Sequence, residues 1–271
     1  MYRAYGDETL RPVGDTEFVN GIAAMSASGQ YGSTRACAGI VSYADLNLGA
    51  QVGAVLDAHM TVSSRFRGIR HAAGWDASEA VRNSHTDPFA GMLADATFRE
   101  GFAQLAPRNL SFDAWLYHPQ ITELTDLAQA FPDTTIILDH LGGPLGIGPY
   151  ASSREAIFKQ WREDVAALAR CDNVVAKLGG MVMPINGFGF HKNDQPPSSD
   201  AIVAATGDYY RHMLDCFGAE RCMFESNFPV DKQSCSYRTL WNAFKKLVAD
   251  ASVSEKAALF HDTAARVYRI A

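Results

Sequence analysis

The 271-residue sequence has no apolar run near the roughly 18 residues that a membrane span needs, and no apolar signal core at its N-terminus. It has no cluster of lysine and arginine, and its net charge of -6 argues against a nucleic-acid or anionic-membrane partner. The five cysteines are scattered without a CxxC pair, so we expect reduced, structural thiols. We therefore expect a cytoplasmic protein that acts on a small molecule, with homo-oligomerisation left open.

Short apolar segments alternate with helical patterns along the whole chain, without a linker or a repeat. The predicted strands span 35–41, 66–71, 111–117, 135–138, 173–180 and 221–227. Strands that alternate with helices predict parallel β/α units. The sequence therefore predicts a single α/β domain over residues 1–271.

Four of these strands end in polar or ionisable residues, and this is the main functional signal. The residues are Arg70-His71, His118, Asp139-His140 and Asn227. The carboxyl ends of parallel strands meet at one rim, where the active sites of β/α barrels lie. We therefore expect a barrel whose rim carries a catalytic site.

The helical patterns predict helices over 95–106, 120–131, 154–170, 200–217, 234–249 and 254–269. Two earlier helices carry Val52 to His59 and, after a cap at Asp15, an apolar face formed by Phe18, Ile22 and Met25. The segment 181–200 has no periodicity, and a loop of this length is often a lid or a binding loop.

Each candidate also has a purely structural interpretation. His140 could be a core histidine, and His118 could mark a turn before Pro119. Arg70 is suited to clamping a carboxylate or polarising a carbonyl, but could instead form a salt bridge across the rim. Alternation along a strand points His140 inward, and Asp139 toward the helices or sideways to orient a neighbour.

Several motifs resemble the amidohydrolase superfamily, and more narrowly the amidohydrolase-2 type that includes sugar lactonases and dicarboxylate-lactone hydrolases. They are Phe66-Arg-Gly-Ile-Arg-His71, Leu138-Asp-His-Leu-Gly-Gly-Pro144, Lys177-Leu-Gly-Gly180 and Met223-Phe-Glu-Ser-Asn-Phe-Pro229. The resemblance runs along essentially the whole chain. It implies a (β/α)8 TIM barrel and a divalent metal, Zn²⁺ or Mn²⁺, with His118 after strand 5 and His140 after strand 6 as ligands.

The chain departs from this pattern at its N-terminus, because it contains no His-x-His pair. Its six predicted strands correspond to strands 3–8 of the barrel, so strands 1 and 2 are missing and the barrel domain is incomplete. Such a barrel would expose two strand edges and leave interior layers unfilled, so we expect a fragment of a longer chain. Two histidines are too few for a tight metal site, which leaves metal-independent chemistry open.

A second departure is Asn227, which stands where the resemblance implies an aspartate after strand 8. An amide takes no proton and binds metal weakly. Glu225 points to the same side of the strand, one layer deeper. We expect Glu225 to ligate a metal or activate water, with an ion pair to Lys177 as the alternative and Asp231 as another possible activator.

The resemblance implies that an activated water hydrolyses a small lactone, which is either the lactone of a sugar acid or an aromatic-degradation intermediate. Arg70 and His71 would bind the substrate, and Phe188 and His191 would contact it from the 181–200 loop. His118, His140, Glu225 and Asn227 would form the catalytic group. The alternatives are a non-oxidative decarboxylase of the same superfamily and a non-catalytic, truncated binding protein.

Overall fold

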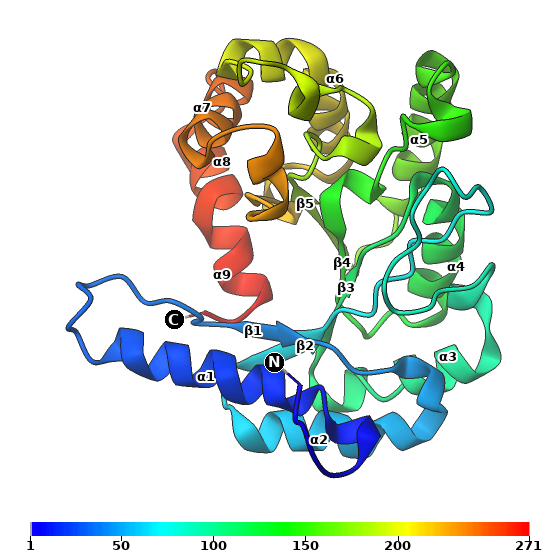
Figure 1. Ribbon diagram of the computed structural model, residues 1–271, viewed down its shortest axis with the longest axis vertical. Coiled ribbons are helices and arrows are strands. Elements are labelled where there is room, and N and C mark those ends of the chain that lie inside the picture. Colours follow the sequence, from blue (N-terminus) through cyan, green and yellow to red (C-terminus); the bar gives the residue numbers. More distant parts are fainter. Residues whose placement is uncertain (1, 271) are drawn as a thin grey trace.

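The computed structural model describes residues 2–270, which form one parallel sheet surrounded by helices (Figure 1). The strands are β1 (Ile40–Ser42), β2 (Phe66–Ile69), β3 (Ser111–Ala114), β4 (Ile136–Leu138), β5 (Val174–Leu178) and β6 (Cys222–Phe224). They pair in chain order, each parallel to the next. The predicted α/β class, with six strands of a TIM-type barrel, is confirmed.

Within residues 2–270, five α-helices connect successive strands as predicted, one precedes the first strand and three follow the last, with bounds that differ from the predicted ones by a few residues. They are α1 (Val13–Ala27), α2 (Val52–Val62), α3 (Ala96–Phe102), α4 (Ile121–Ala130), α5 (Arg154–Leu168), α6 (Ser199–Phe217), α7 (Tyr237–Leu247), α8 (Val253–Ala257) and α9 (Thr263–Val267). A π-helical turn, Ala258–Asp262, divides the last predicted helix into α8 and α9. Within residues 2–270, no helix combines the length and apolarity needed to cross a bilayer.

Helix α1 packs with a different face from the predicted one. Phe18 and Met25 are about half exposed, whereas the buried positions include Val13, Thr16 and Ala23. The small residues allow α1 to pack closely on α2, and Thr16 Oγ1 contacts His59 Nδ1 of α2 at 2.7 Å. The predicted apolar face was therefore wrong.

Most of the apolar core lies between the sheet and the surrounding helices. A second, smaller cluster lies inside the curve of the sheet, where Ile137, Val175 and Met223 meet Val267 of α9. These three strand residues come from β4, β5 and β6, so the C-terminal helix packs against the inward face of three neighbouring strands.

The C-terminal segment also contacts β2, at the other end of the strand order from β6. Arg67 Nε donates to the Tyr268 carbonyl oxygen at 2.5 Å, and its Nη2 donates to that of Arg269 at 3.3 Å. In Figure 1 the red C-terminal segment accordingly ends beside β1 and β2. The segment therefore spans the opening between β6 and the β1–β2 pair, and fills part of the barrel interior.

Candidate active site

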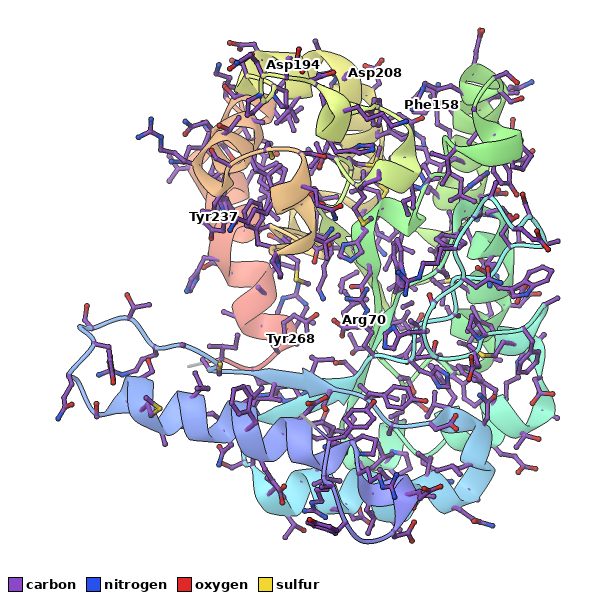
Figure 2. The ribbon with its side chains drawn as sticks, viewed as in Figure 1. Arg70, Phe158, Asp194, Asp208, Tyr237 and Tyr268 are labelled. Carbon is purple, nitrogen blue, oxygen red and sulfur yellow. The ribbon has the colours of Figure 1, made fainter. Side chains whose placement is uncertain are left out.

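A cavity of about 380 Å³ opens at the carboxyl ends of the strands. Its walls come from the segments that follow β2, β3, β4, β5 and β6. The lining residues are Arg70, Arg82, Asn83, Ser84, His85, Trp115, Tyr117, His140, Met183, Ile185, Asn227 and Val230. Arg70 lies near the middle of the molecule, between the N-terminal and C-terminal halves (Figure 2). Three residues predicted for the rim site, Arg70, His140 and Asn227, therefore line this cavity.

His140 reaches this cavity through an unusual backbone turn. Strand β4 stops at Leu138, and the next residues form a 3₁₀ turn in which His140 and Leu141 have φ of 51° and 56°. The turn breaks the alternation of the strand, so Asp139 and His140 both join the polar network of the site. Gly180 permits this packing, because a Cβ there would lie 2.8 Å from the Cβ of His140.

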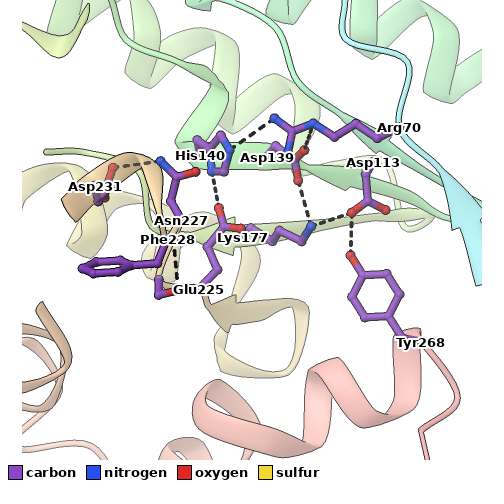
Figure 3. A network of polar contacts seen from close by, with 11 residues as sticks. Arg70, Asp113, Asp139, His140, Lys177, Glu225, Asn227, Phe228, Asp231 and Tyr268 are labelled. Atoms are coloured by element: carbon purple, nitrogen blue, oxygen red, sulfur yellow. Dashed lines mark hydrogen bonds and ion pairs between the residues drawn. The ribbon is translucent and has the colours of Figure 1, made fainter. Parts of the chain in front are cut away.

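The imidazole of His140 is held on three sides (Figure 3). Nδ1 makes a very short contact with Glu225 Oε1, and Nε2 lies 3.4 Å from Arg70 Nη2. The ring also meets Trp115 edge to face, with centroids 4.9 Å apart. A carboxylate at Nδ1 favours the tautomer with its proton on that nitrogen, which leaves Nε2 as the acceptor on the side of Arg70.

Asp139 is fully buried and holds Arg70 in position. Its Oδ2 lies 3.2 Å from Arg70 Nε, and its Oδ1 lies 3.1 Å from Lys177 Nζ. Burial alone would raise the pKa of Asp139, but the positive charges of Lys177 and Arg70 outweigh it and lower that pKa. Asp139 therefore remains ionised and orients its neighbours, the sideways role that the sequence left open.

Lys177 extends the network to the C-terminal segment. Its Nζ donates to Asp113 Oδ2 at 2.5 Å, and the Tyr268 hydroxyl donates to the same oxygen at 2.8 Å. Burial would lower the pKa of Lys177, but the carboxylates of Asp113 and Asp139 raise it well above its usual value. Lys177 therefore stays charged, and a chain of contacts runs from Tyr268 to His140.

Glu225 is paired with His140 and makes no ion pair with Lys177 among the described residues. Lys177 instead pairs with Asp113 of β3 and with Asp139, which follows β4. The alternative interpretation of Glu225, an ion pair with Lys177, is wrong. His140 also lies between the Glu225 carboxylate and the cavity, which argues against Glu225 as the direct activator of water.

Asn227 lines the cavity and is itself supported by Asp231. Asn227 has a left-handed backbone, with φ of 50°, and its Nδ2 donates to Asp231 Oδ1 at 2.8 Å. Asp231 is completely buried, and burial raises its pKa to about 7, against the effect of the Asn227 hydrogen bond. Asp231 orients the amide and does not line the cavity.

His118 and His71, also predicted for the site, do not line the cavity with His140. His118 Nδ1 accepts from the Leu145 amide at 3.2 Å, and burial lowers the pKa of His118 to about 4. His71 is fully buried, accepts from the Leu46 amide and packs on Phe98. Both hold loops at the strand ends, so the structure does not support their predicted metal-binding or substrate-binding roles.

Phe188 and His191 also lie outside the cavity. Phe188 packs edge to face on Tyr209 of α6, and the Arg154 guanidinium lies 4.2 Å from its ring centroid. His191 lines a separate hollow next to Gly148. The 181–200 segment reaches the cavity only through Met183 and Ile185, because its aromatic residues pack against α5 and α6.

Two cavity residues were missed as site residues in the sequence. Arg82 and His85 lie in the long segment after His71, and the sequence patterns selected neither of them. Neither follows a strand directly, so the strand-end pattern could not select them. Their positions depend on how this loop folds back over the end of β3.

The residues around His140 do not fit a divalent metal. Glu225 occupies Nδ1, while the Arg70 guanidinium faces Nε2 and would repel a dication. Asn227 donates its amide to Asp231 and offers only a neutral oxygen. Within residues 2–270, no three His, Cys, Asp or Glu side chains converge to form a ligand set. The predicted pair of His118 and His140 is therefore not assembled as a metal site.

Comparisons with known proteins agree with this architecture. The chain is 37% identical over 265 residues to protein y4mH of Sinorhizobium fredii, covering 98% of this chain and 78% of that protein. It is 27% identical to an L-fucono-1,5-lactonase of Burkholderia multivorans, over 76% of this chain and 64% of that enzyme's length.

A similar fold is seen in a zinc-bound crystal structure of an amidohydrolase from Burkholderia multivorans. The TM-score is 0.75, at 23% identity over 95% of this chain and 80% of that one. The amidohydrolase family model matches residues 33–270, nearly the whole sequence. The strand-end motifs, the parallel half-barrel and this match together show that the chain belongs to the amidohydrolase family and is a hydrolase.

Proposed function

We propose that this protein opens a small lactone with a water molecule activated by His140, without a metal ion. The observation that carries the proposal is the series of contacts from Glu225 through His140 to Arg70, of which His140 and Arg70 line the cavity. A carboxylate, an imidazole and a guanidinium in this order supply a positioned base next to an electrophilic group. The similarity to proteins named L-fucono-1,5-lactonase supports a lactone as the substrate.

In the proposed reaction, a water molecule replaces the 3.4 Å contact between Arg70 Nη2 and His140 Nε2, and this nitrogen takes a proton from the water as the water oxygen bonds to the lactone carbonyl carbon. The negative charge that develops on the carbonyl oxygen is stabilised by the Arg70 guanidinium, which Asp139 holds in place. The bond from the carbonyl carbon to the ring oxygen then breaks, and that oxygen takes the proton from His140. The product is the open hydroxy acid.

Glu225 acts in this scheme through His140. Its carboxylate fixes the tautomer and the ring orientation, and it stabilises the imidazolium that forms during the reaction. Glu225 is therefore a positioning residue, and the sequence-based idea that it activates water directly is replaced by an indirect role.

The test is turnover of a panel of five- and six-membered lactones by the full chain. We expect His140→Gln to lower kcat by about 10²- to 10⁴-fold, because it removes the base. We expect Glu225→Gln to lower kcat less and to change the pH profile. His261→Gln is the matched control, since His261 is exposed on the π-helical turn, and it should retain full activity.

Metal dependence is tested in the same assay. Activity should persist after prolonged treatment with a chelator and should not rise on addition of Zn²⁺ or Mn²⁺. Loss of turnover with the chelator and recovery with metal would contradict the metal-free reaction. Full activity of His140→Gln would show that His140 is not the base, and would contradict the proposal.

A non-oxidative decarboxylase is the second candidate, because Arg70 and Arg82 line the same cavity and an arginine can bind a carboxylate. The two reactions are separated by their products. Release of CO₂ from an aromatic acid, without ring opening of any lactone, would identify the decarboxylase.

A further inference from the structure

The cavity at His140 is lined by positively charged or protonatable side chains and by no carboxylate. Arg70, Arg82, His85 and His140 contribute to its wall, whereas no aspartate or glutamate among the described residues does. The chain as a whole carries a net charge of -6. A cationic cavity in an acidic protein favours an anionic ligand through charge complementarity.

The two arginines differ in how many of their hydrogen-bond donors are free to bind a ligand. Arg70 uses Nε for Asp139 and Nη2 for His140, so it is part of the catalytic network. Arg82 makes no side-chain hydrogen bond or ion pair within residues 2–270, and its side chain is exposed at the cavity. All donors of the Arg82 guanidinium are therefore available to a ligand.

The loop that carries Arg82, residues 73–86, is fixed by hydrogen bonds. The Ala73 amide donates to the Trp115 carbonyl at 2.7 Å, and Gln120 Nε2 donates to the Ala73 carbonyl at 2.7 Å. At the far end of the loop, the Tyr117 hydroxyl makes a very short hydrogen bond to the carbonyl oxygen of Arg82 itself. The backbone of Arg82 is therefore held at the end of β3.

Contacts within the loop complete this support. The Asp76 amide donates to Asn83 Oδ1 at 2.7 Å, and the Ser84 amide donates to the Gly74 carbonyl at 2.9 Å. Ser84 also lines the cavity, and its buried Oγ has no hydrogen-bond partner in residues 2–270. The cavity thus offers a free guanidinium from a fixed loop.

We propose that this cavity selects lactones that carry a carboxylate, and that Arg82 is the residue that binds it, with His85 beside it. The identity of the ligand as a lactone rests on the proposed function, whereas the preference for a carboxylate rests on the lining of the cavity alone. Arg82 contacts the carboxylate away from the reacting carbonyl, which lies at Arg70 and His140. It therefore determines specificity and takes no part in proton transfer.

Binding is tested first, with two rings that cannot be hydrolysed. Isothermal titration of the full chain compares tetrahydropyran-2-carboxylate with tetrahydropyran-2-methanol, which share the ring and differ in charge. We expect the carboxylate to bind at least tenfold more tightly, with a preference that weakens as salt rises. Arg82→Gln should abolish the preference and leave binding of the neutral ring unchanged.

The matched control is Arg238→Gln, which removes the same charge from an exposed position on α7, outside the cavity. It should bind both rings as the unaltered protein does. Equal affinity of the unaltered protein for the two rings would overturn the proposal. An equal loss of preference in both variants would also overturn it, because the effect would then come from net charge.

Turnover separates this proposal from the proposed function. The matched substrates are the lactones 6-oxotetrahydropyran-2-carboxylate and 6-(hydroxymethyl)tetrahydropyran-2-one, which carry the charged and the neutral group on the same ring carbon. Arg82→Gln should lower kcat/KM at least tenfold for the carboxylate alone. If neither lactone is opened but the carboxylate preference holds, the proposed hydrolysis fails and the anion site stands. If both are opened equally and Arg82→Gln changes neither, the hydrolysis stands and the anion site fails.

Discussion

Non-glycine residues with a left-handed backbone occur at the ends of both β4 and β6. His140, Leu141 and Asn227 have φ between 50° and 56°. This conformation is uncommon for non-glycine residues other than asparagine, and it persists where the surrounding structure holds it. Here it turns His140 toward Glu225 and Asn227 toward Asp231, so both unusual turns serve the same cavity.

Asp231 gives a prediction on pH dependence at this scale. Burial raises its pKa from 3.8 to about 7 in the folded chain. In the unfolded chain the carboxyl loses its proton near pH 4, so the folded state binds more protons between about pH 4 and 7. Stability must therefore fall as pH rises through this window. Asp231→Asn removes this pH-dependent loss of stability, because asparagine does not ionise. The variant should therefore be more stable than the unaltered protein at pH 8 but not at pH 4.

The measurement is urea unfolding at pH 4, 6 and 8. The gain at pH 8 is bounded at about 4 kcal/mol by the shift of roughly three pKa units. Asp194→Asn is the control, because Asp194 lies on the exposed surface before α6 (Figure 2) and should show no such trend. A difference between Asp231→Asn and the unaltered protein that stays constant with pH would contradict the assignment.

Strand β5 carries the buried charge on which the site depends. Lys177 faces Asp113 on β3 and Asp139 after β4, and both carboxylates are buried. Removing one partner of a buried ion pair leaves an uncompensated charge, which typically costs about 3–5 kcal/mol. We expect Lys177→Met to destabilise the fold by that amount in urea unfolding. It should also lower kcat, since Asp139 loses one of its two partners.

The control for this prediction is Lys159→Met on the exposed surface of α5, which should change stability by less than about 0.5 kcal/mol. A second variant distinguishes charge from packing. Combining Lys177→Met with Asp113→Asn should recover part of the stability, because one unpaired carboxylate is then neutral. A further loss of similar size in the double variant would point to packing instead.

At this scale the sequence predicts the elements better than it predicts their partners. The order of strands, and the gathering of Arg70, His140 and Asn227 at one rim, follow from apolar runs and their polar ends. The partner of Lys177 does not, because alternation gives the side of a strand but not which neighbouring strand a long side chain reaches. The prediction of the buried face of α1 was wrong for a related reason, since periodicity identifies an apolar stripe on a helix but not which element packs on it.

For the molecule as a whole, the position of α9 decides how the interior of the half-barrel is filled. Val267 packs on Ile137, Val175 and Met223, and Tyr268 donates to Asp113 one layer nearer the site. The C-terminal segment formed by α9 and Tyr268 therefore supports both the apolar layer and the ionic layer under His140. We infer that the C-terminal segment contributes to stability and to the geometry of the site together.

Val267→Ala tests this contribution. The substitution removes buried methyl groups and leaves a small cavity, so we expect a loss of about 1.5–3 kcal/mol in urea unfolding. Val253→Ala is the matched control, because Val253 begins α8 and is 87% exposed. Alanine favours a helix slightly over valine, so the control should be neutral or marginally stabilising. If the two variants lose the same stability, α9 does not pack into the interior of the half-barrel in solution.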